Sequence, residues 1–266
     1  MARSRIVRSW RSVLDPRKLY LDLLKKAVAG TLYGDEPDHE DRSVARFVKR
    51  FSEHYIEGSA HTMTPLVRLD NVEHCVVDVL ERGVPGDFLE AGVWRGGVTI
   101  LMRGILKAYG VTDRRVWVAD SFQGLPAPDR ERFPLEAEAH SGPVMTEVYR
   151  HFAVSLDDVK RNFARYDLLD DQVRFLPGWF KDVLPGAPIG SLAVLRLDGD
   201  YYESTMDALL GLYPKLSLGG YVIVDDYGES LWTHCRRAVD EFRERFAIRT
   251  GLVSVDSKCV YWRRDT

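Results

Sequence analysis

Residues 192–228 decide the fold class, and they read LAVLRLDGDYYESTMDALLGLYPKLSLGGYVIVDDYG. An apolar run ends in Asp198-Gly199-Asp200, a segment with helical spacing follows, and a second apolar run ends in Asp225-Asp226. Strand, helix and strand in this order are typical of a βαβ unit, whose two strands are parallel. If they are neighbours, Asp198 lies beside Asp225 and Asp226 at one edge of a parallel sheet.

The same alternation extends outward from this unit. Apolar runs typical of buried strands occur at 87–92, 115–121 and 172–178. Because they are continuous rather than alternating, they indicate an α/β fold whose parallel sheet is covered on both faces. Ligands of such sheets bind beyond the carboxyl ends of the strands. We expect helices at 16–33, 43–57, 65–83, 96–110, 155–168, 204–216 and 235–246, two strands around a turn at Asp256-Ser257 within 251–264, and no regular structure at 126–153.

The composition is that of an ordinary globular protein and argues against several classes. The 266 residues include 37 Lys and Arg against 40 Asp and Glu, a formal net charge of −3, so no basic surplus favours nucleic acid. No window of about 18 apolar residues is present, so no membrane span is expected. Cys75, Cys235 and Cys259 lack C-x-x-C spacing, which argues against a zinc site or disulfide framework and favours a reducing cytoplasm.

The first strand ends in a glycine-containing loop, Glu90-Ala91-Gly92-Val93-Trp94-Arg95-Gly96-Gly97. Its spacing differs from the G-x-G-x-x-G of dinucleotide-binding loops, and Glu90 would repel a pyrophosphate. A carboxylate here suits a cationic ligand such as S-adenosylmethionine (SAM), which has a sulfonium and an amino group and no phosphate. By itself the loop is also explained by a tight strand-to-helix turn. We assign Glu90, Gly92 and Arg95 to a cofactor site.

The next two strand ends add residues suited to a nucleoside. Asp120 and Ser121 follow the second strand, where an acid can accept both hydroxyls of a ribose. Both residue types also favour helix N-caps. Gly178, Trp179 and Phe180 follow the third strand, and the aromatic rings there are suited to covering an adenine or to packing in the core.

The acids after the last two parallel strands predict a metal site. Three clustered carboxylates repel one another unless a cation binds or one takes a proton. Oxygen ligands favour Mg²⁺, so we assign Asp198, Asp225 and Asp226 to it. A strand-end turn followed by a helix cap would explain one of the two acidic pairs. Two such pairs at neighbouring strand ends favour a metal site. A metal lowers the pKa of a bound hydroxyl, whose proton Asp200 or Asp198 would take as the catalytic base.

Long motifs resemble a known family. The loop at Glu90, the stretches VWVADSFQGLP and YDLLDDQVRFLPGWFKD, residues 193–228 and the final VYWRR are similar to the macrocin O-methyltransferases. Members of this family methylate sugar hydroxyls on macrolides and a noviose hydroxyl in novobiocin assembly. The resemblance implies a SAM- and Mg²⁺-dependent enzyme of antibiotic biosynthesis. It implies a Rossmann-like sheet of seven strands whose last strand is antiparallel.

The resemblance also implies roles for particular residues. It assigns Asp198, Asp225 and Asp226 to the metal and an acid of Asp198-Gly199-Asp200 to the base. Thr62 and Met63 are expected near SAM or the acceptor. The resemblance also places Glu90, Gly92, Asp120 and Ser121 around SAM.

The domain organisation follows from the same resemblance. Residues 1–84 are expected to be a helical extension with part of a lid, and 85–266 the methyltransferase domain, with a lid insertion at about 126–153. Segments 34–58 and 126–153 depart most from the family, and long irregular loops of this kind often bind substrate. The chemistry therefore carries over from the resemblance, and the acceptor does not.

Several acceptors and functions stay open. The leading hypothesis is methylation of a deoxysugar or related hydroxyl on a small natural product. Alternatives are a phenolic or catecholic acceptor, a nucleotide sugar, an NAD(P)-dependent epimerase or reductase, and a non-catalytic SAM-binding protein. A symmetric homo-oligomer is expected, with residues 1–33 as a candidate contact.

Overall fold

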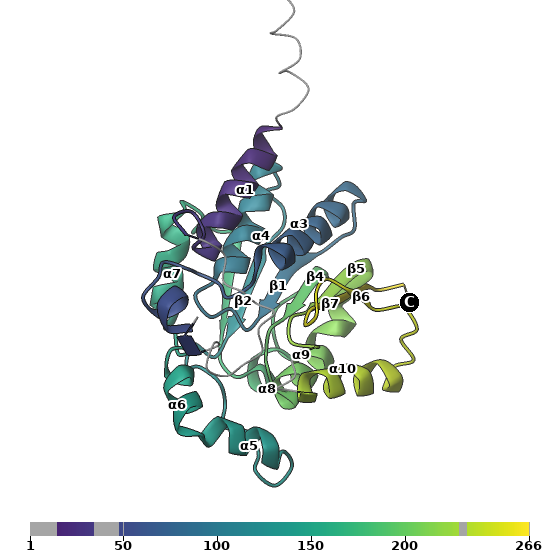
Figure 1. Cartoon of the computed structure of the whole chain (residues 1–266). Coiled ribbons are helices and arrows are strands. Elements are labelled where there is room, and N and C mark those ends of the chain that lie inside the picture. Colours follow the sequence, from purple (N-terminus) through teal and green to yellow (C-terminus); the bar gives the residue numbers. More distant parts are fainter. Residues whose placement is uncertain (1–14, 35–47, 50, 229–232, 266) are drawn as a thin grey trace, which may run out of the picture.

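A seven-stranded sheet forms the centre of the computed structural model, which describes residues 15–34, 48–49, 51–228 and 233–265 (Figure 1). The strand order is β3-β2-β1-β4-β5-β7-β6. Strands β1 to β5 pair in parallel, whereas β7 is antiparallel to both β5 and β6. This confirms the parallel sheet with an antiparallel last strand. The strands are β1 Asp87–Ala91, β2 Val116–Asp120, β3 Val173–Pro177, β4 Leu192–Leu197, β5 Leu216–Val224, β6 Val253–Ser254 and β7 Val260–Arg263.

Helices cover both faces of the sheet, so the central strands β1, β2 and β4 are buried on both faces. Along β1, Phe88 packs in one apolar cluster and Leu89 in the other, because successive side chains point to opposite faces. This explains the continuous apolar runs. Helices α1 Pro16–Ala29, α3 Leu66–Glu81, α4 Gly97–Ala108 and α7 Leu156–Arg165 contribute to the first cluster. Helices α8 Phe180–Val183, α9 Tyr202–Leu212 and α10 Thr233–Arg245, with a 3₁₀ turn at Tyr213–Lys215, lie on the second face.

Local signals explain several helix ends. The side chain of Asp15 accepts the Arg17 N–H at the start of α1, and Gly30 ends that helix in the left-handed conformation. The Ser155 side chain accepts the Asp158 N–H and caps α7, as its spacing predicts. The helix expected at 43–57 lies partly outside the described residues, and Phe51–Ile56 forms a π-helical turn. The boundary between 1–84 and 85–266 stays a prediction.

The segment at 126–153, called the lid below, is more regular than expected. It contains two helices, α5 Pro134–Ser141 and α6 Pro143–Arg150, which lie away from the sheet in Figure 1. Each begins with a proline, whose fixed φ suits the first turn of a helix. With eight residues, each is too short to show a clear apolar periodicity. An aromatic cluster that includes Phe51, Tyr149 and Tyr201 packs the lid against the rest of the molecule.

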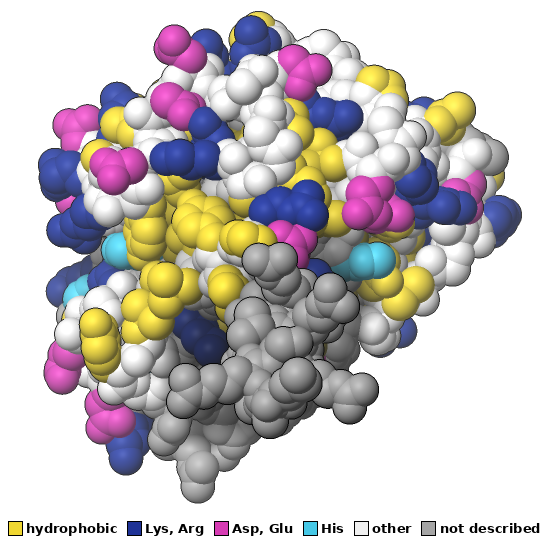
Figure 2. All heavy atoms as spheres, turned by 90° about the horizontal axis from the view of Figure 1, so that it is seen from above, with side chains coloured by type: hydrophobic (Ala, Val, Ile, Leu, Met, Phe, Trp, Pro, Cys, Tyr) yellow, Lys and Arg dark blue, Asp and Glu magenta, His cyan; other side chains and the backbone are white. Residues whose placement is uncertain are grey.

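The surface carries charges of both signs. Figure 2 shows Lys and Arg side chains interspersed with Asp and Glu on one face, with apolar side chains between them. This distribution agrees with the formal net charge of −3. In the described ranges, no helix combines the length and the apolar character needed to cross a membrane.

Candidate active site

The acids at the ends of β4 and β5 converge. These strands are neighbours in parallel, with Leu197 paired to Val224, so the residues that follow them leave the sheet side by side. One carboxylate oxygen each from Asp198, Asp225 and Asp226 lies within 4.8 Å of the others. The structure therefore brings together the three residues that the sequence predicts as metal ligands.

A buried arginine lies behind these carboxylates. Arg196, in β4, is fully inaccessible to solvent. Its guanidinium donates to Asp198 Oδ2 at 2.9 Å, to Thr64 Oγ1 at 2.9 Å, and to carboxylate oxygens of Glu90 and Asp225. It thus joins an acid in β1 to the acids that follow β4 and β5, and it supplies positive charge within the acidic cluster.

A second arginine reaches the cluster from α3. Arg68 Nη1 lies 2.7 Å from Asp225 Oδ2, and Arg68 Nε lies 2.6 Å from Asp256 Oδ2 in the turn between β6 and β7. Burial would raise the pKa of Asp225, but the charges of Arg196 and Arg68 outweigh it and hold that pKa below its ordinary value. Asp225 is therefore ionised at neutral pH.

The other two carboxylates are less well compensated. Burial raises the pKa of Asp198 to about 6 in spite of the charge of Arg196. Burial and the charges of Asp200 and Asp198 hold the pKa of Asp226 well above its ordinary value. Clustered carboxylates of this kind favour a bound cation, and an all-oxygen donor set suits Mg²⁺. The residues present therefore fit a divalent cation.

The loop after β1 brings the backbone close to these acids. Gly92 has φ +90°, and a Cβ built there would lie 1.8 Å from the carbonyl oxygen of Asp198. Only glycine is compatible with this approach. The Gly92 N–H donates to the Ala119 carbonyl at 2.9 Å, so the loop continues from the sheet edge between β2 and β4.

Asp120 holds the same loop from the end of β2. Its carboxylate accepts the Val93 N–H and the Phe122 N–H, each at 2.8 Å. Burial raises the pKa of Asp120, although these hydrogen bonds act in the opposite direction. Ser121 Oγ donates to the Gly124 carbonyl at 2.8 Å and orders the turn that follows. Asp120, the predicted ribose contact, and Ser121, a predicted SAM contact, therefore lie beside the glycine-containing loop.

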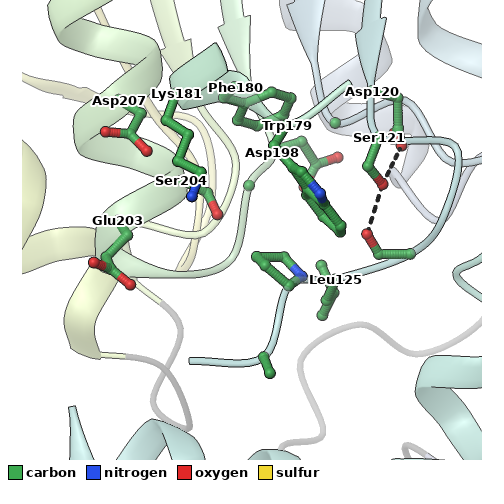
Figure 3. Close-up of a pocket in the computed structure, with 15 residues that line it drawn as sticks. Asp120, Ser121, Leu125, Trp179, Phe180, Lys181, Asp198, Glu203, Ser204 and Asp207 are labelled. Carbon is green, nitrogen blue, oxygen red and sulfur yellow. Dashed lines mark hydrogen bonds between the residues drawn. The ribbon is translucent and has the colours of Figure 1, made fainter. Parts of the chain in front are cut away.

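A cavity of about 250 Å³ opens beyond these strand ends (Figure 3). In Figure 3, Asp120 and Ser121 lie on one side, and the Trp179 indole extends between Asp198 and Leu125. Six predicted site residues line it, namely Gly92, Asp120, Ser121, Trp179, Phe180 and Asp198. The other lining residues are Gly124, Leu125, Pro126, Ala127, Lys181, Gly199, Glu203, Ser204 and Asp207.

Other predicted cofactor residues lie outside that lining. Glu90 is 1% exposed and bonds to Arg196, and burial raises its pKa to about 8 although Arg196 acts in the opposite direction. Arg95 donates to the Ala60 carbonyl at 2.9 Å. Thr62 is buried, and Met63 packs against the aromatic cluster of the lid. Gly178 follows β3 with φ +139°. Their cofactor roles stay predictions.

The candidate base has an unusual backbone. Asp200 has φ +59°, in the left-handed region that non-glycine residues seldom adopt. In this conformation its N–H donates to Asp226 Oδ2 at 3.2 Å. The loop that carries Asp198 and Asp200 is therefore tied directly to the carboxylate pair after β5.

Two residues of the site were missed by sequence reasoning. Arg196 had a signal, because it interrupts an otherwise apolar strand and a buried charge requires partners. Arg68 had none, since it lies on a helix 157 residues away from its partner Asp225.

Comparisons with known proteins show the family and the fold. Residues 49–264 match the family model described as macrocin-O-methyltransferase. The chain is 50% identical over 267 residues to demethyldecarbamoylnovobiocin O-methyltransferase of Streptomyces niveus, covering 97% of this chain and 98% of that protein. It is 51% identical over 250 residues to mycinamicin III 3''-O-methyltransferase of Micromonospora griseorubida, covering 93% and 96%. The solved structure of the O-methyltransferase NovP superposes with a TM-score of 0.81 at 50% identity, covering 94% of this chain and 100% of that one.

Proposed function

The chain belongs to the macrocin O-methyltransferase family, and we propose that it transfers the methyl group of SAM to a sugar hydroxyl of an antibiotic or related natural product, with Mg²⁺ as a cofactor. One observation carries this proposal. Asp198 lines the cavity that suits the cofactor and also belongs to the three-carboxylate cluster. A methyl donor in the cavity and an acceptor hydroxyl at the cluster would therefore meet at this residue.

The cavity supplies groups suited to each part of SAM. Asp120 would accept the ribose hydroxyls, and the rings of Trp179 and Phe180 would cover the adenine. Near the glycine-containing loop, the acids favour the sulfonium and the amino group. In the described part of the chain, Glu90 Oε2 is buried without a hydrogen-bond partner, and we propose it as an acceptor for the amino group although Glu90 itself does not line the cavity.

The acidic cluster supplies the acceptor chemistry. Asp198, Asp225 and Asp226 would hold Mg²⁺, which when bound lowers the pKa of a coordinated hydroxyl. Asp200 would take the hydroxyl proton, because Arg196 already engages Asp198. Orientation then contributes much of the rate, since the acceptor oxygen needs only to be held in line with the methyl group.

The acceptor class is inferred from the relatives. The Streptomyces olivaceus relative, 50% identical over 262 residues, is named for an acceptor that carries a dimethoxy-rhamnosyl group. A sugar hydroxyl is therefore our first choice, ahead of a phenolic acceptor or a nucleotide sugar.

Methyl transfer from labelled SAM tests the proposal. The panel should include demethyldecarbamoylnovobiocin, mycinamicin III, a nucleotide sugar and a catechol, each with MgCl₂ and with EDTA. We expect a methylated glycoside, with turnover lost in EDTA and in Asp198→Ala. Methylation of the catechol alone would overturn the acceptor class, and full turnover in EDTA would overturn the metal dependence.

A further inference from the structure

Helix α9 begins directly after the loop that carries Asp198 and Asp200, and it lacks a cap of its own. Its N-cap residue is Tyr201, whose side chain makes no capping hydrogen bond. The first N–H groups of a helix have no partner within the helix, and they favour negative charge. The start of α9 therefore needs acceptors from elsewhere in the molecule.

The lid supplies such an acceptor. The Tyr202 N–H, the first of α9, donates to Glu136 Oε1 on α5 at 3.3 Å. Glu136 is 1% exposed, although it is a carboxylate on a surface element. His234 Nδ1 lies 3.8 Å from the same oxygen. A buried carboxylate is costly unless it is paired, so this contact is more than incidental packing.

A second lid residue holds the adjacent tyrosine. His140 lies one helical turn after Glu136, on the same face of α5. The Tyr201 hydroxyl and His140 Nδ1 are 2.8 Å apart, and the His140 ring stacks on Tyr149 at 4.9 Å. Burial lowers the pKa of His140, so its neutral ring can accept the Tyr201 O–H.

Three polar contacts of this part of the lid fall on the consecutive residues 201–203. Besides the contacts to Tyr201 and Tyr202, Arg132 forms an ion pair with Glu203 at 2.7 Å. These residues directly follow Asp200, whose left-handed backbone must be held by its surroundings. Neither Glu136 nor His140 lines the cavity, so they act on the cofactor site only through other residues.

We propose that Glu136 and His140 are positioning residues, which cap α9 from the lid and thereby hold Asp198 and Asp200 in place only when the lid is docked. This inference rests on the proposed function for its catalytic meaning. Its structural content, that lid contacts order the 198–204 loop, can be tested in the protein alone. Docking of the lid over an acceptor and assembly of the base would then be one event.

Amide hydrogen exchange of the unliganded protein is the primary test. Glu136→Ala and His140→Leu should accelerate exchange of the amides at 199–204 by about three- to thirtyfold, the range expected for a lost cap. Glu136→Gln and His140→Asn keep an acceptor and should stay near the wild type. Ser141→Ala is the matched control, because its hydroxyl bonds only to carbonyls within α5.

Faster exchange confined to the lid, with 199–204 unchanged, would overturn the proposal. If Glu136→Ala does not fold, Tyr201→Phe, which keeps its ring, should still accelerate exchange at 199–204.

Turnover then connects the cap to catalysis. The same variants should lose kcat when acceptor and SAM are both saturating, because the loosened loop carries Asp198 and Asp200. A change in acceptor KM alone would assign them to substrate binding and contradict positioning. Absence of any methyl transfer by the wild type would remove the proposed function, and the exchange result would still decide whether the lid orders the loop.

Discussion

Replacing Arg196 with methionine tests whether the acidic cluster is balanced as described. Methionine keeps much of the side-chain length and removes the charge. The guanidinium is fully buried and bonds to Glu90, Asp198 and Asp225. Its removal leaves the buried carboxylates of Glu90 and Asp225 and the half-buried carboxylate of Asp198, and among the described residues only Asp225 keeps an arginine partner, Arg68.

The expected cost follows from that arrangement. Removing one partner of a buried ion pair destabilises a protein by about 3–5 kcal/mol. We expect this loss in EDTA, measured by urea denaturation. The same substitution removes a positive charge that would repel a cation at the proposed metal site, so Mg²⁺ should bind Arg196→Met more tightly than it binds the wild type. At the same MgCl₂ concentration, the variant should therefore gain more stability than the wild type does. A concentration of 100 times the variant's Kd should add about 2.7 kcal/mol.

A matched control separates charge balance from loss of an arginine in the sheet. Arg174 lies in β3 and donates to the Val173 carbonyl, so Arg174→Met should change stability by less than about 0.5 kcal/mol. A loss below about 1 kcal/mol for Arg196→Met in EDTA would refute the reasoning. Weaker Mg²⁺ binding by that variant would contradict the electrostatic part.

Three further predictions concern stability. Gly92→Ala should cost more than about 3 kcal/mol in urea denaturation, because its Cβ would meet the Asp198 carbonyl at 1.8 Å. At Gly83, φ is +64° and no described atom lies within 4 Å of an added Cβ, so Gly83→Ala should cost about 1–2 kcal/mol. Equal losses would contradict the close approach at Gly92. Burial raises the pKa of Glu136 from an ordinary 4.5 to about 7. Between pH 4.5 and pH 7, the Glu136 carboxyl is therefore protonated in the folded state and ionised in the unfolded state. Stability should fall as pH rises from 4.5 to 7, by at most about 3 kcal/mol, and Glu136→Gln should flatten that part of the curve; an unchanged slope would refute this. MgCl₂ should raise the wild-type Tm, and EDTA should reverse the rise, while Asp198→Ala should show neither effect; an equal rise in the variant would reject the ligand assignment.

Much of the fold and part of the site follow from the sequence for one physical reason. Parallel strands end at a common edge, so acids after two neighbouring strands must converge. Asp198, Asp225 and Asp226 could be grouped in this way before any coordinates were known. The cavity lining at Asp120, Ser121 and Trp179 follows from the same rule.

The remaining features depend on contacts that no local pattern encodes. The pairing of Arg68 with Asp225 joins a helix to a strand end, and neither segment shows which partner the other will have. The helices of the lid are too short to show an apolar periodicity. Their docking at Tyr201 depends on tertiary contacts rather than on local helix propensity. Glu90 illustrates the same limit. Its position near the end of a strand could be predicted from the sequence, but its burial against Arg196 could not.

The turn between β6 and β7 has a consequence for biosynthesis. Asp256 in that turn fixes Arg68, and Arg68 in turn holds Asp225. The hairpin follows all three proposed metal ligands in the chain, so these acids are synthesised before the residue that anchors their arginine. The last contact of the site can therefore form only after most of the sheet has been synthesised. A chain truncated after α10 would keep every proposed ligand, yet Arg68 would lack its anchor.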